Sequence, residues 1–460
     1  MSADQLAAVP FAILWAGAAT MWAGSRVVRP DGRAWSALAA TLAAAAALAV
    51  AVPTPDTAFG GTLRRDGAVV AASLVILAAT SGSLLLHVGR IGRGSTRAAD
   101  AAALSLLAAS GALLTAGAGD LVVAFIGAEL MSIPLYGLCG LVRAADRPHA
   151  AAIGQVVHGG VATAVLAFGV ALVHAGTGGT ALADAGRTDA PLALAGTALV
   201  LAALGHRALL IPFHPSGAAA MAAAPTYLSA LVVVVPRTAV LALLFRVCGS
   251  LSDPAAAVDW RASFAVIAAM AVLIADLGAL RQRSLRGLIA YGALSQGAYA
   301  LVALAAGVDA TTALIFLLVV GAAATVGSFG AVARLGLDEP RIADATGLAR
   351  RRPLVGATLI VLLLALAGLP PTGGFVAKLL VLEAAMRAQL AWLVILGALT
   401  SAISATAYLR VVFACLEEGE GAPVHRWSIS AAVVVAAAGV VVVLGVAPWL
   451  LVGPLRGLQF

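Results

Sequence analysis

The chain has 460 residues, of which 62% are hydrophobic and 11% charged, and its formal net charge is +7. A soluble protein of this length does not reach so high an apolar content, so the sequence predicts an all-α polytopic membrane protein embedded in a lipid bilayer. The positive charge comes from short arginine clusters between apolar runs. This pattern is typical of membrane topology signals and argues against a nucleic-acid partner.

Apolar runs of roughly 20 residues, the length that a helix needs to cross a bilayer, recur about fourteen times along the chain. Many of them are rich in Ala and Gly, which lets neighbouring helices approach closely. We therefore predict about fourteen transmembrane helices. Their approximate centres are Leu14, Ala44, Leu77, Leu107, Met131, Ala164, Ala202, Val235, Ala271, Leu301, Gly321, Ala365, Ile403 and Val440.

The arginines in the loops between these runs are distributed unequally. Taken over alternate loops, one side carries 16 arginines and the other side 6. The positive-inside rule assigns the richer side to the cytoplasm, and with an even number of spans both termini are then predicted on the outer side. The abundance of Ala, Gly and Arg indicates a bacterial protein, and so a location in the plasma membrane.

Glu129 is an ionisable residue inside a predicted span, in LVVAFIGAELMSIPLYGL. A carboxylate at membrane depth is costly unless it is paired or protonated. Two interpretations follow: a structural pair with Arg143 near a helix end, or one member of an ion pathway.

A second group of charges surrounds the run RALLIPFHPSGAAAMAAAP, which Pro212 and Pro215 are expected to interrupt. His206 and Arg207 precede the break, and Arg237 lies in the next span. A carboxylate followed by cationic groups on separate spans is the arrangement that a proton relay requires, because each charge shifts the pKa of its neighbour.

The run DLGALRQRSLRGLIAYGALSQGAYALVAL joins two further spans. Asp276 and Arg281 mark the cytoplasmic boundary there, and we interpret the charged cluster mainly as an anchor. Ser295 and Gln296 fall inside the following span, where their polar groups can support water-mediated proton transfer.

The most unusual stretch is LLLALAGLPPTGGFVAKLL, in which Pro370, Pro371, Gly373 and Gly374 interrupt an apolar run and Lys378 follows. Lys378 is the only lysine in the chain. A lysine can be tuned to release a proton, whereas arginine stays protonated. A broken helix with an ionisable group beyond the break predicts an ion site. The alternative is a kinked structural helix whose lysine reaches the membrane surface.

Several of these runs resemble one known family. GAELMSIPLYGL, LLIPFHPSGAAAMAAAPT, the run around DLGALRQ and the double-proline stretch are similar to the antiporter-like membrane subunits of the proton-pumping NADH–quinone oxidoreductase, respiratory complex I. The likeness extends roughly from Leu121 to Val412. Length and span number resemble the subunit N group more than the longer subunits L and M.

The resemblance implies a fold of two inverted five-helix repeats, each with one broken helix. Residues 1–98 would form three N-terminal helices, 99–250 the first repeat, 251–415 the second repeat and 416–460 a C-terminal helix. It also implies proton translocation driven by quinone reduction elsewhere in the complex. No catalytic, cofactor or metal residue is expected in this chain; quinone, flavin and iron–sulfur clusters are expected in partner subunits of the membrane and peripheral arms.

The resemblance also implies roles for individual residues. Glu129 matches the family glutamate of the fifth span, and Lys378 matches the family lysine of the twelfth. Arg207 and Arg237 stand where the family has lysines in the seventh and eighth spans. Gln296 stands where the family has a histidine in the tenth.

A further lysine, usual in the sixth span, falls near Gly154, which carries no charge. Arginine keeps the positive charge at the substituted positions, yet it does not readily release a proton. His206, beside Arg207, has an unperturbed pKa near 6.5 in the range that a relay needs, and is the expected replacement.

Three functions therefore remain open. The chain is a working proton-translocating subunit with a rewired relay, a paralogous scaffold subunit with impaired pumping, or a subunit of a multi-subunit cation–proton antiporter. The proteins that copurify with it would separate these functions.

Overall fold

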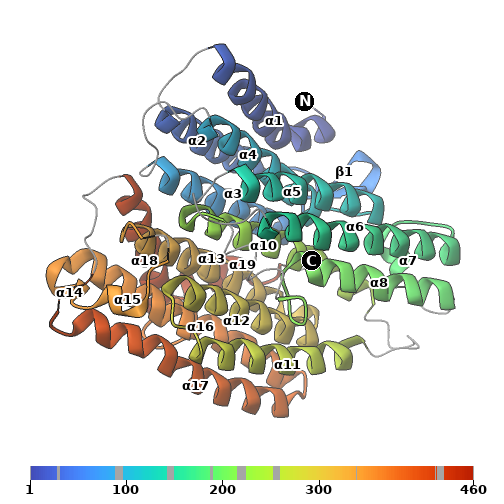
Figure 1. The fold of residues 1–460 in the computed structure, drawn as a ribbon. Coiled ribbons are helices and arrows are strands. Elements are labelled where there is room, and N and C mark those ends of the chain that lie inside the picture. The colour runs from blue at the N-terminus through green and yellow to red at the C-terminus, as the bar shows by residue number, and fades with distance from the viewer. Residues whose placement is uncertain are drawn as a thin grey trace.

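The computed structural model describes residues 2–27, 32–88, 97–141, 150–186, 190–214, 224–251, 260–337, 339–419, 421 and 429–458. This part of the chain is built almost entirely of helices, as the all-α prediction requires (Figure 1). Its exception is a small antiparallel hairpin of β1 (Thr57–Ala58) and β2 (Leu63–Arg64). Three short 3-10 helices span Phe59–Gly61, Val308–Ala310 and Ile342–Ala345.

The helices are, in chain order, α1 (Ala3–Val27), α2 (Gly32–Val50), α3 (Gly67–Val88), α4 (Arg97–Ala116), α5 (Leu121–Leu141), α6 (Ala150–Thr177), α7 (Leu182–Ala185), α8 (Pro191–Arg207), α10 (Thr226–Ser250), α11 (Trp260–Leu280), α12 (Leu285–Ala306), α13 (Thr311–Ala333), α14 (Leu348–Arg351), α15 (Pro353–Ala367), α16 (Gly373–Arg387), α17 (Ala391–Leu416), α18 (Ile429–Val446) and α19 (Trp449–Leu455). Every predicted span centre lies within one of them.

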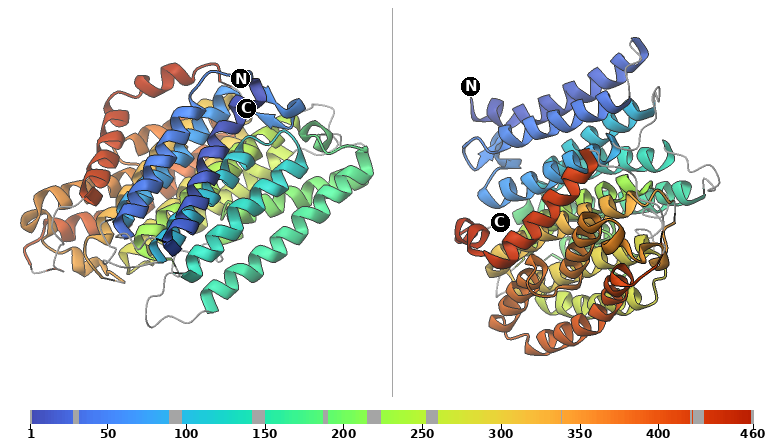
Figure 2. Two further views of the ribbon diagram at one scale, coloured as in Figure 1. Left: turned by 90° about the horizontal axis from the view of Figure 1, so that it is seen from above. Right: turned by 90° about the vertical axis from the view of Figure 1, so that its left-hand side faces the viewer.

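Of the described helices, 12 are long and apolar enough to cross a membrane, and α8 and α15 are shorter apolar helices. Figure 2 shows that the long helices are inclined in a common direction. The polytopic membrane fold is therefore confirmed. The count of fourteen crossings, the inverted repeats and the four domain boundaries stay predictions.

The core lies where the two halves of the chain meet. The apolar stretch of helix α10 is buried along its whole length, and those of α12 and α13 are buried almost as completely. Helix α10 packs against α3 and α4 on one side and against α13 on the other. A charged side chain on α10 or α12 is therefore far from lipid and faces protein on all sides.

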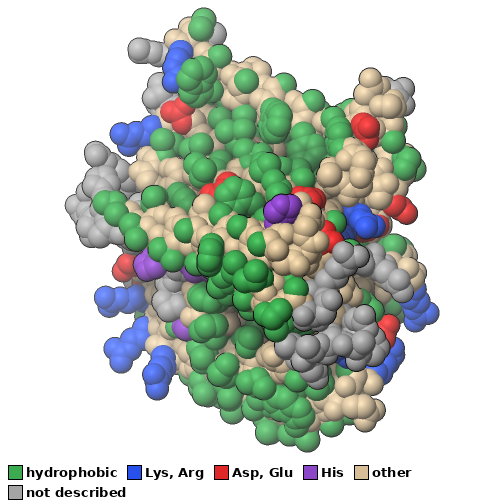
Figure 3. Space-filling model, turned by 90° about the vertical axis from the view of Figure 1, so that its right-hand side faces the viewer, with side chains coloured by type: hydrophobic (Ala, Val, Ile, Leu, Met, Phe, Trp, Pro, Cys, Tyr) green, Lys and Arg blue, Asp and Glu red, His purple; other side chains and the backbone are tan. Residues whose placement is uncertain are grey.

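Loops at the ends of the helices are joined by isolated β-bridges. The bridges are Leu63–Ala118, Asp120–Ala181 and Ser284–Arg341. The first two join loops that were all predicted on the outer side, and the third joins two loops predicted in the cytoplasm. In Figure 3, Lys and Arg side chains gather towards two lateral edges, and apolar side chains cover much of the area between.

The double-proline stretch interrupts a helix as predicted. Helix α15 ends at Ala367, and Gly368 takes a left-handed φ of 78° that terminates it. The chain then passes through Pro370 and Pro371 before α16 begins at Gly373. A Cβ on Gly374 would stand 1.9 Å from the carbonyl oxygen of Ala365, so only glycine permits this return of the chain.

At the first predicted break, α8 ends at Arg207, before Pro212. The backbone continues through turns to His214. Pro215 lies outside the described residues.

Candidate functional site

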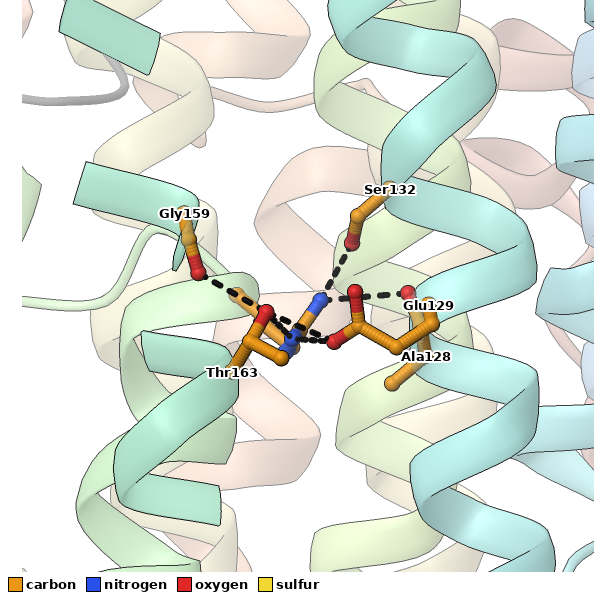
Figure 4. Close-up of polar contacts among 6 residues, drawn as sticks. Ala128, Glu129, Ser132, Gly159 and Thr163 are labelled. Carbon is orange, nitrogen blue, oxygen red and sulfur yellow. Dashed lines mark hydrogen bonds and ion pairs between the residues drawn. The ribbon is translucent and has the colours of Figure 1, made fainter. Parts of the chain in front are cut away.

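Glu129 and Arg207 form an ion pair between α5 and the last residue of α8 (Figure 4). The Arg207 guanidinium also donates to Ser132 Oγ at 2.5 Å and to the carbonyl oxygen of Ala128 at 3.1 Å. Thr163 on α6 lies 2.9 Å from Arg207 Nη2, and its hydroxyl donates to Glu129 Oε1 at 2.7 Å. Three helices thus meet at one charge pair.

This pair is well shielded from the surroundings. The Arg207 side chain is 2% exposed and the Glu129 side chain 20% exposed. Ser132 follows Glu129 by three residues, so α5 presents both acceptors on one face. The planar guanidinium can bond to the Glu129 carboxylate and the Ser132 hydroxyl at the same time, with better geometry than an ammonium. Arg207 therefore acts as a fixed positive charge that holds α5, α6 and α8 together.

His206 lies directly beside this pair in the sequence and is half-buried. Its ring meets the edge of Phe213, with the ring centroids 5.7 Å apart. It interacts electrostatically with Arg207 and with His158 of α6. The Nδ1 atom of His158 is 2.7 Å from the carbonyl oxygen of Gly154. Two titratable imidazoles thus accompany the arginine.

Arg237 lies on α10 in the core, 6% exposed. Within the described part of the chain, its Nε and Nη2 atoms have no hydrogen-bond partner. Its side chain packs against α12: a Cβ on Gly297 would be 3.5 Å from Arg237 Nε and 3.2 Å from Leu210, at the first break. Arg237 is therefore placed between the first break and the second half of the chain.

Gln296 precedes Gly297 on α12 and is also buried. Neither of its amide atoms bonds to another described residue, and Oε1 lies against Gly321 of α13. Buried polar groups of this kind are tolerated where water or another polar group reaches them. Arg237 and Gln296 are two of the buried polar residues of the core.

Lys378 lies on α16, beyond the second break, and is buried. Its ammonium donates to the carbonyl oxygen of Ala367 and to Ser401 Oγ, each at 2.9 Å, and lies 4.7 Å from the ring centre of Tyr299. Ala367 is the last residue of α15, so its carbonyl has no partner within that helix. The negative end of the α15 dipole thus stabilises the positive charge. A membrane-surface lysine is excluded.

Asp276 was expected to mark the end of a span. It lies in α11, four residues before that helix ends at Leu280, and it is buried. Its side chain is 1% exposed, and Oδ1 accepts a hydrogen bond from Ser295 Oγ at 2.8 Å. The signal available in the sequence was its place inside the apolar run VLIADLGAL, before the arginines begin.

The predicted residues therefore fall into three places. Glu129, Arg207 and His206 gather at the first break, and Arg237 and Gln296 lie in the core. Lys378 lies at the second break, with Asp276 across α12 from it. Among the described residues, no hydrogen bond or ion pair joins one of these three places directly to the next.

Residues 118–404 match the family described as NADH:quinone oxidoreductase/Mrp antiporter, TM. The NADH-quinone oxidoreductase subunit N 1 of Sorangium cellulosum (strain So ce56) is 37% identical over 365 residues, which are 74% of this chain and 72% of that protein.

Solved structures show the same fold. A chain of respiratory complex I from Thermus thermophilus, solved with bound aureothin, has a TM-score of 0.83 at 27% identity and covers 96% of this chain and 98% of that chain. A chain of the Mrp complex from Dietzia sp. DQ12-45-1b has a TM-score of 0.84 at 21% identity, covering 98% and 95%, and shares the fold. By the extent of the family match and the identity to subunit N, the chain belongs to the NADH:quinone oxidoreductase/Mrp antiporter family of membrane subunits.

Proposed function

We propose that this chain is the subunit N of a complex I-like NADH–quinone oxidoreductase and takes part in proton translocation across the bacterial plasma membrane. The observation that carries the proposal is a pair of buried cations beside the two helix breaks, Arg207 and Lys378, within a family of proton-translocating membrane subunits. Charged groups inside a membrane protein are costly and mark ion pathways.

In this proposal the redox chemistry takes place in partner subunits, which hold the flavin, the iron–sulfur clusters and the quinone. Other membrane-arm subunits are the direct partners, and both complex I and Mrp relatives are parts of multi-subunit complexes. The present chain contributes charges that change their protonation when the partners change conformation.

The two halves contribute differently. Glu129 and Arg207 supply a fixed dipole, because arginine keeps its proton, and His206 beside them supplies the group that titrates. Lys378 supplies an ammonium whose proton can leave, because its partners are neutral oxygens and an aromatic ring. Arg237 and Gln296 lie in the core and would influence proton transfer between His206 and Lys378.

A second candidate is a subunit of a multi-subunit cation–proton antiporter. The observation that favours it is the close match in fold to the Mrp complex. A third candidate, a scaffold with impaired pumping, draws support from the arginines at two lysine positions.

The test is a strain in which this chain carries an affinity tag. We expect flavin- and quinone-binding subunits to copurify with it, and we expect inverted membrane vesicles to acidify when NADH is supplied. Vesicles from a strain that lacks the chain should lose that acidification. Copurification with antiporter subunits alone would favour the second candidate. Full acidification per NADH by an assembled complex without the chain would favour the third.

A further inference from the structure

Asp276 is a deeply buried carboxylate of the membrane region, 1% exposed, and among the described residues no arginine bonds to it. Its Oδ1 atom accepts from Ser295 Oγ at 2.8 Å, and its Oδ2 atom has no hydrogen-bond partner in the described part of the chain. Arg410 on α17, which packs against α11, donates instead to the carbonyl oxygen of Leu280 at 3.0 Å. A carboxylate with one hydroxyl partner is stable in such a place only if it is protonated or near a cation.

Lys378 is a buried cation without a directly bonded carboxylate among the described residues. Its hydrogen bonds go to Ala367 and Ser401, which are neutral, so no carboxylate bonds to the ammonium directly. The nearest acid that acts on it electrostatically is Asp276. In the first half the corresponding charges, Glu129 and Arg207, touch each other. In the second half a positive and a negative charge are held apart.

Helix α12 lies between the two charges and contacts both. Ser295 binds Asp276, and the ring of Tyr299 lies 4.7 Å from Lys378 Nζ. These two residues are four apart, so they occupy one face of α12. Helix α12 packs against both α11, which carries Asp276, and α16, which carries Lys378 (Figure 1). Asp276 also acts electrostatically on Tyr299 and on Tyr408 of α17, which places it at the same buried cluster.

We propose that Asp276 is a proton-binding carboxylate coupled to Lys378 across α12. While Asp276 is ionised, its charge stabilises the Lys378 ammonium. When a proton reaches Oδ2, the carboxyl becomes neutral and the ammonium loses its counter-charge, which favours release of its proton. In the complete exchange one N–H bond of Lys378 breaks and one O–H bond of Asp276 forms, so the pair passes from charged to neutral without a net change of charge.

This inference rests on the proposed function, and its test uses the assembled complex. The variants are Asp276→Asn, Asp276→Glu, Lys378→Met and the double variant Asp276→Asn with Lys378→Met. Asp309→Asn removes an exposed carboxylate and is the matched control. The measurements are the midpoint of thermal unfolding and the number of protons pumped per quinone reduced.

We expect Asp276→Asn to pump fewer protons per quinone than Asp309→Asn, and Asp276→Glu to recover part of the loss. We also expect the double variant to unfold at a higher temperature than the two single shifts predict when added, since removing both charges leaves neither unpaired. An Asp276 that is not coupled to Lys378 would give additive shifts.

Normal pumping by Asp276→Asn, or additive shifts, would overturn the coupling. If Asp276→Asn pumps normally while Lys378→Met does not, only this inference fails. If Lys378→Met also pumps normally, the proposed function itself is wrong.

Discussion

Two buried cations of this chain are held by different chemistry. Arg207 binds a carboxylate, two hydroxyls and a carbonyl, which suits a planar group with several fixed donors. Lys378 binds one carbonyl and one hydroxyl and faces an aromatic ring. A guanidinium bonded to a carboxylate keeps its proton, whereas an ammonium with neutral contacts can give it up. The residue types therefore match a fixed charge in one half and an exchangeable charge in the other.

Lys378→Arg separates charge from proton exchange. We expect this variant to assemble and to pump fewer protons, because the positive charge remains but is not released. Lys378→Met should also assemble less well, since it leaves the Ala367 carbonyl without its donor, a loss of about 1–3 kcal/mol. Dye quenching in inverted vesicles measures pumping, and native gels measure assembly. Full pumping by Lys378→Arg would show that charge alone suffices.

Glu129→Gln tests the ion pair of the first half. It leaves the buried Arg207 charge unpaired, so we expect the complex to lose about 3–5 kcal/mol of stability. Glu383→Gln is the matched control: its ion pair with Arg387 is exposed on α16 and is worth about 0–1 kcal/mol. Thermal unfolding of the purified complex should separate the two variants, and equal unfolding midpoints would contradict a stabilising role for Glu129.

His206 is the titrating group that we assign to the first half. His206→Ala should lower pumping while the complex stays assembled, because its ring packs mainly against Phe213. Arg207→Lys should compensate for that loss, since it restores a titratable amine beside the missing imidazole. The measurement is proton pumping by each single variant and by the double variant. Normal pumping by His206→Ala with Arg207 in place would make the histidine a packing residue.

At the scale of the helix elements, the second break depends on glycine. A Cβ on Gly374 would stand 1.9 Å from the carbonyl oxygen of Ala365, so Gly374→Ala forces α15 and α16 apart. That separation would also move Lys378 away from Ala367. We expect less assembled complex and less pumping. Gly439→Ala on α18 is the control, because a Cβ there meets nothing within 4 Å. Equal yields of both variants would show that the break is not tightly packed.

Helix positions could be predicted from the sequence because membrane spans are encoded locally. A run of apolar residues must form a helix in lipid to satisfy its backbone, and tandem prolines with glycines must interrupt it. For this reason each predicted centre falls in a helix, and the break at Pro370 and Pro371 lies where it was expected.

The partners of the buried charges could not be predicted in the same way. Thr163 and Ser401 are ordinary hydroxyl residues in the sequence, and they become ligands of Glu129 and Lys378 only because α6 and α17 are packed beside them. The burial of Asp276 could not be predicted for a related reason: hydropathy places it near a span end, while its burial depends on α12 and α17. Long-range packing of helices decides which polar residues come into contact, and local sequence patterns give no information on that packing.

At the scale of the whole molecule, the loops separate into two sets. One set includes β1, β2 and the loops after α4 and α6, joined by the Leu63–Ala118 and Asp120–Ala181 bridges. The Arg246–Asp66 ion pair, at 2.7 Å, links the end of α10 to the same set. The other set contains the Ser284–Arg341 bridge and the Arg350–Glu418 ion pair. Each of these contacts therefore joins loops that the arginine count assigns to the same side of the membrane.

Which set faces the cytoplasm is a prediction that follows from the arginine count of 16 against 6. Reporter fusions placed after Arg97 and after Arg352 should report a cytoplasmic location, and a fusion after Arg187 should report the outer side. Arg187 lies outside the described residues, but the Asp120–Ala181 bridge holds the neighbouring chain with the other outer loops. A cytoplasmic signal from all three fusions would break the alternation and remove the even number of spans. A reversed signal from all three would keep the fold and invert the protein in the membrane, so that His206 and Lys378 would exchange protons with the opposite compartments.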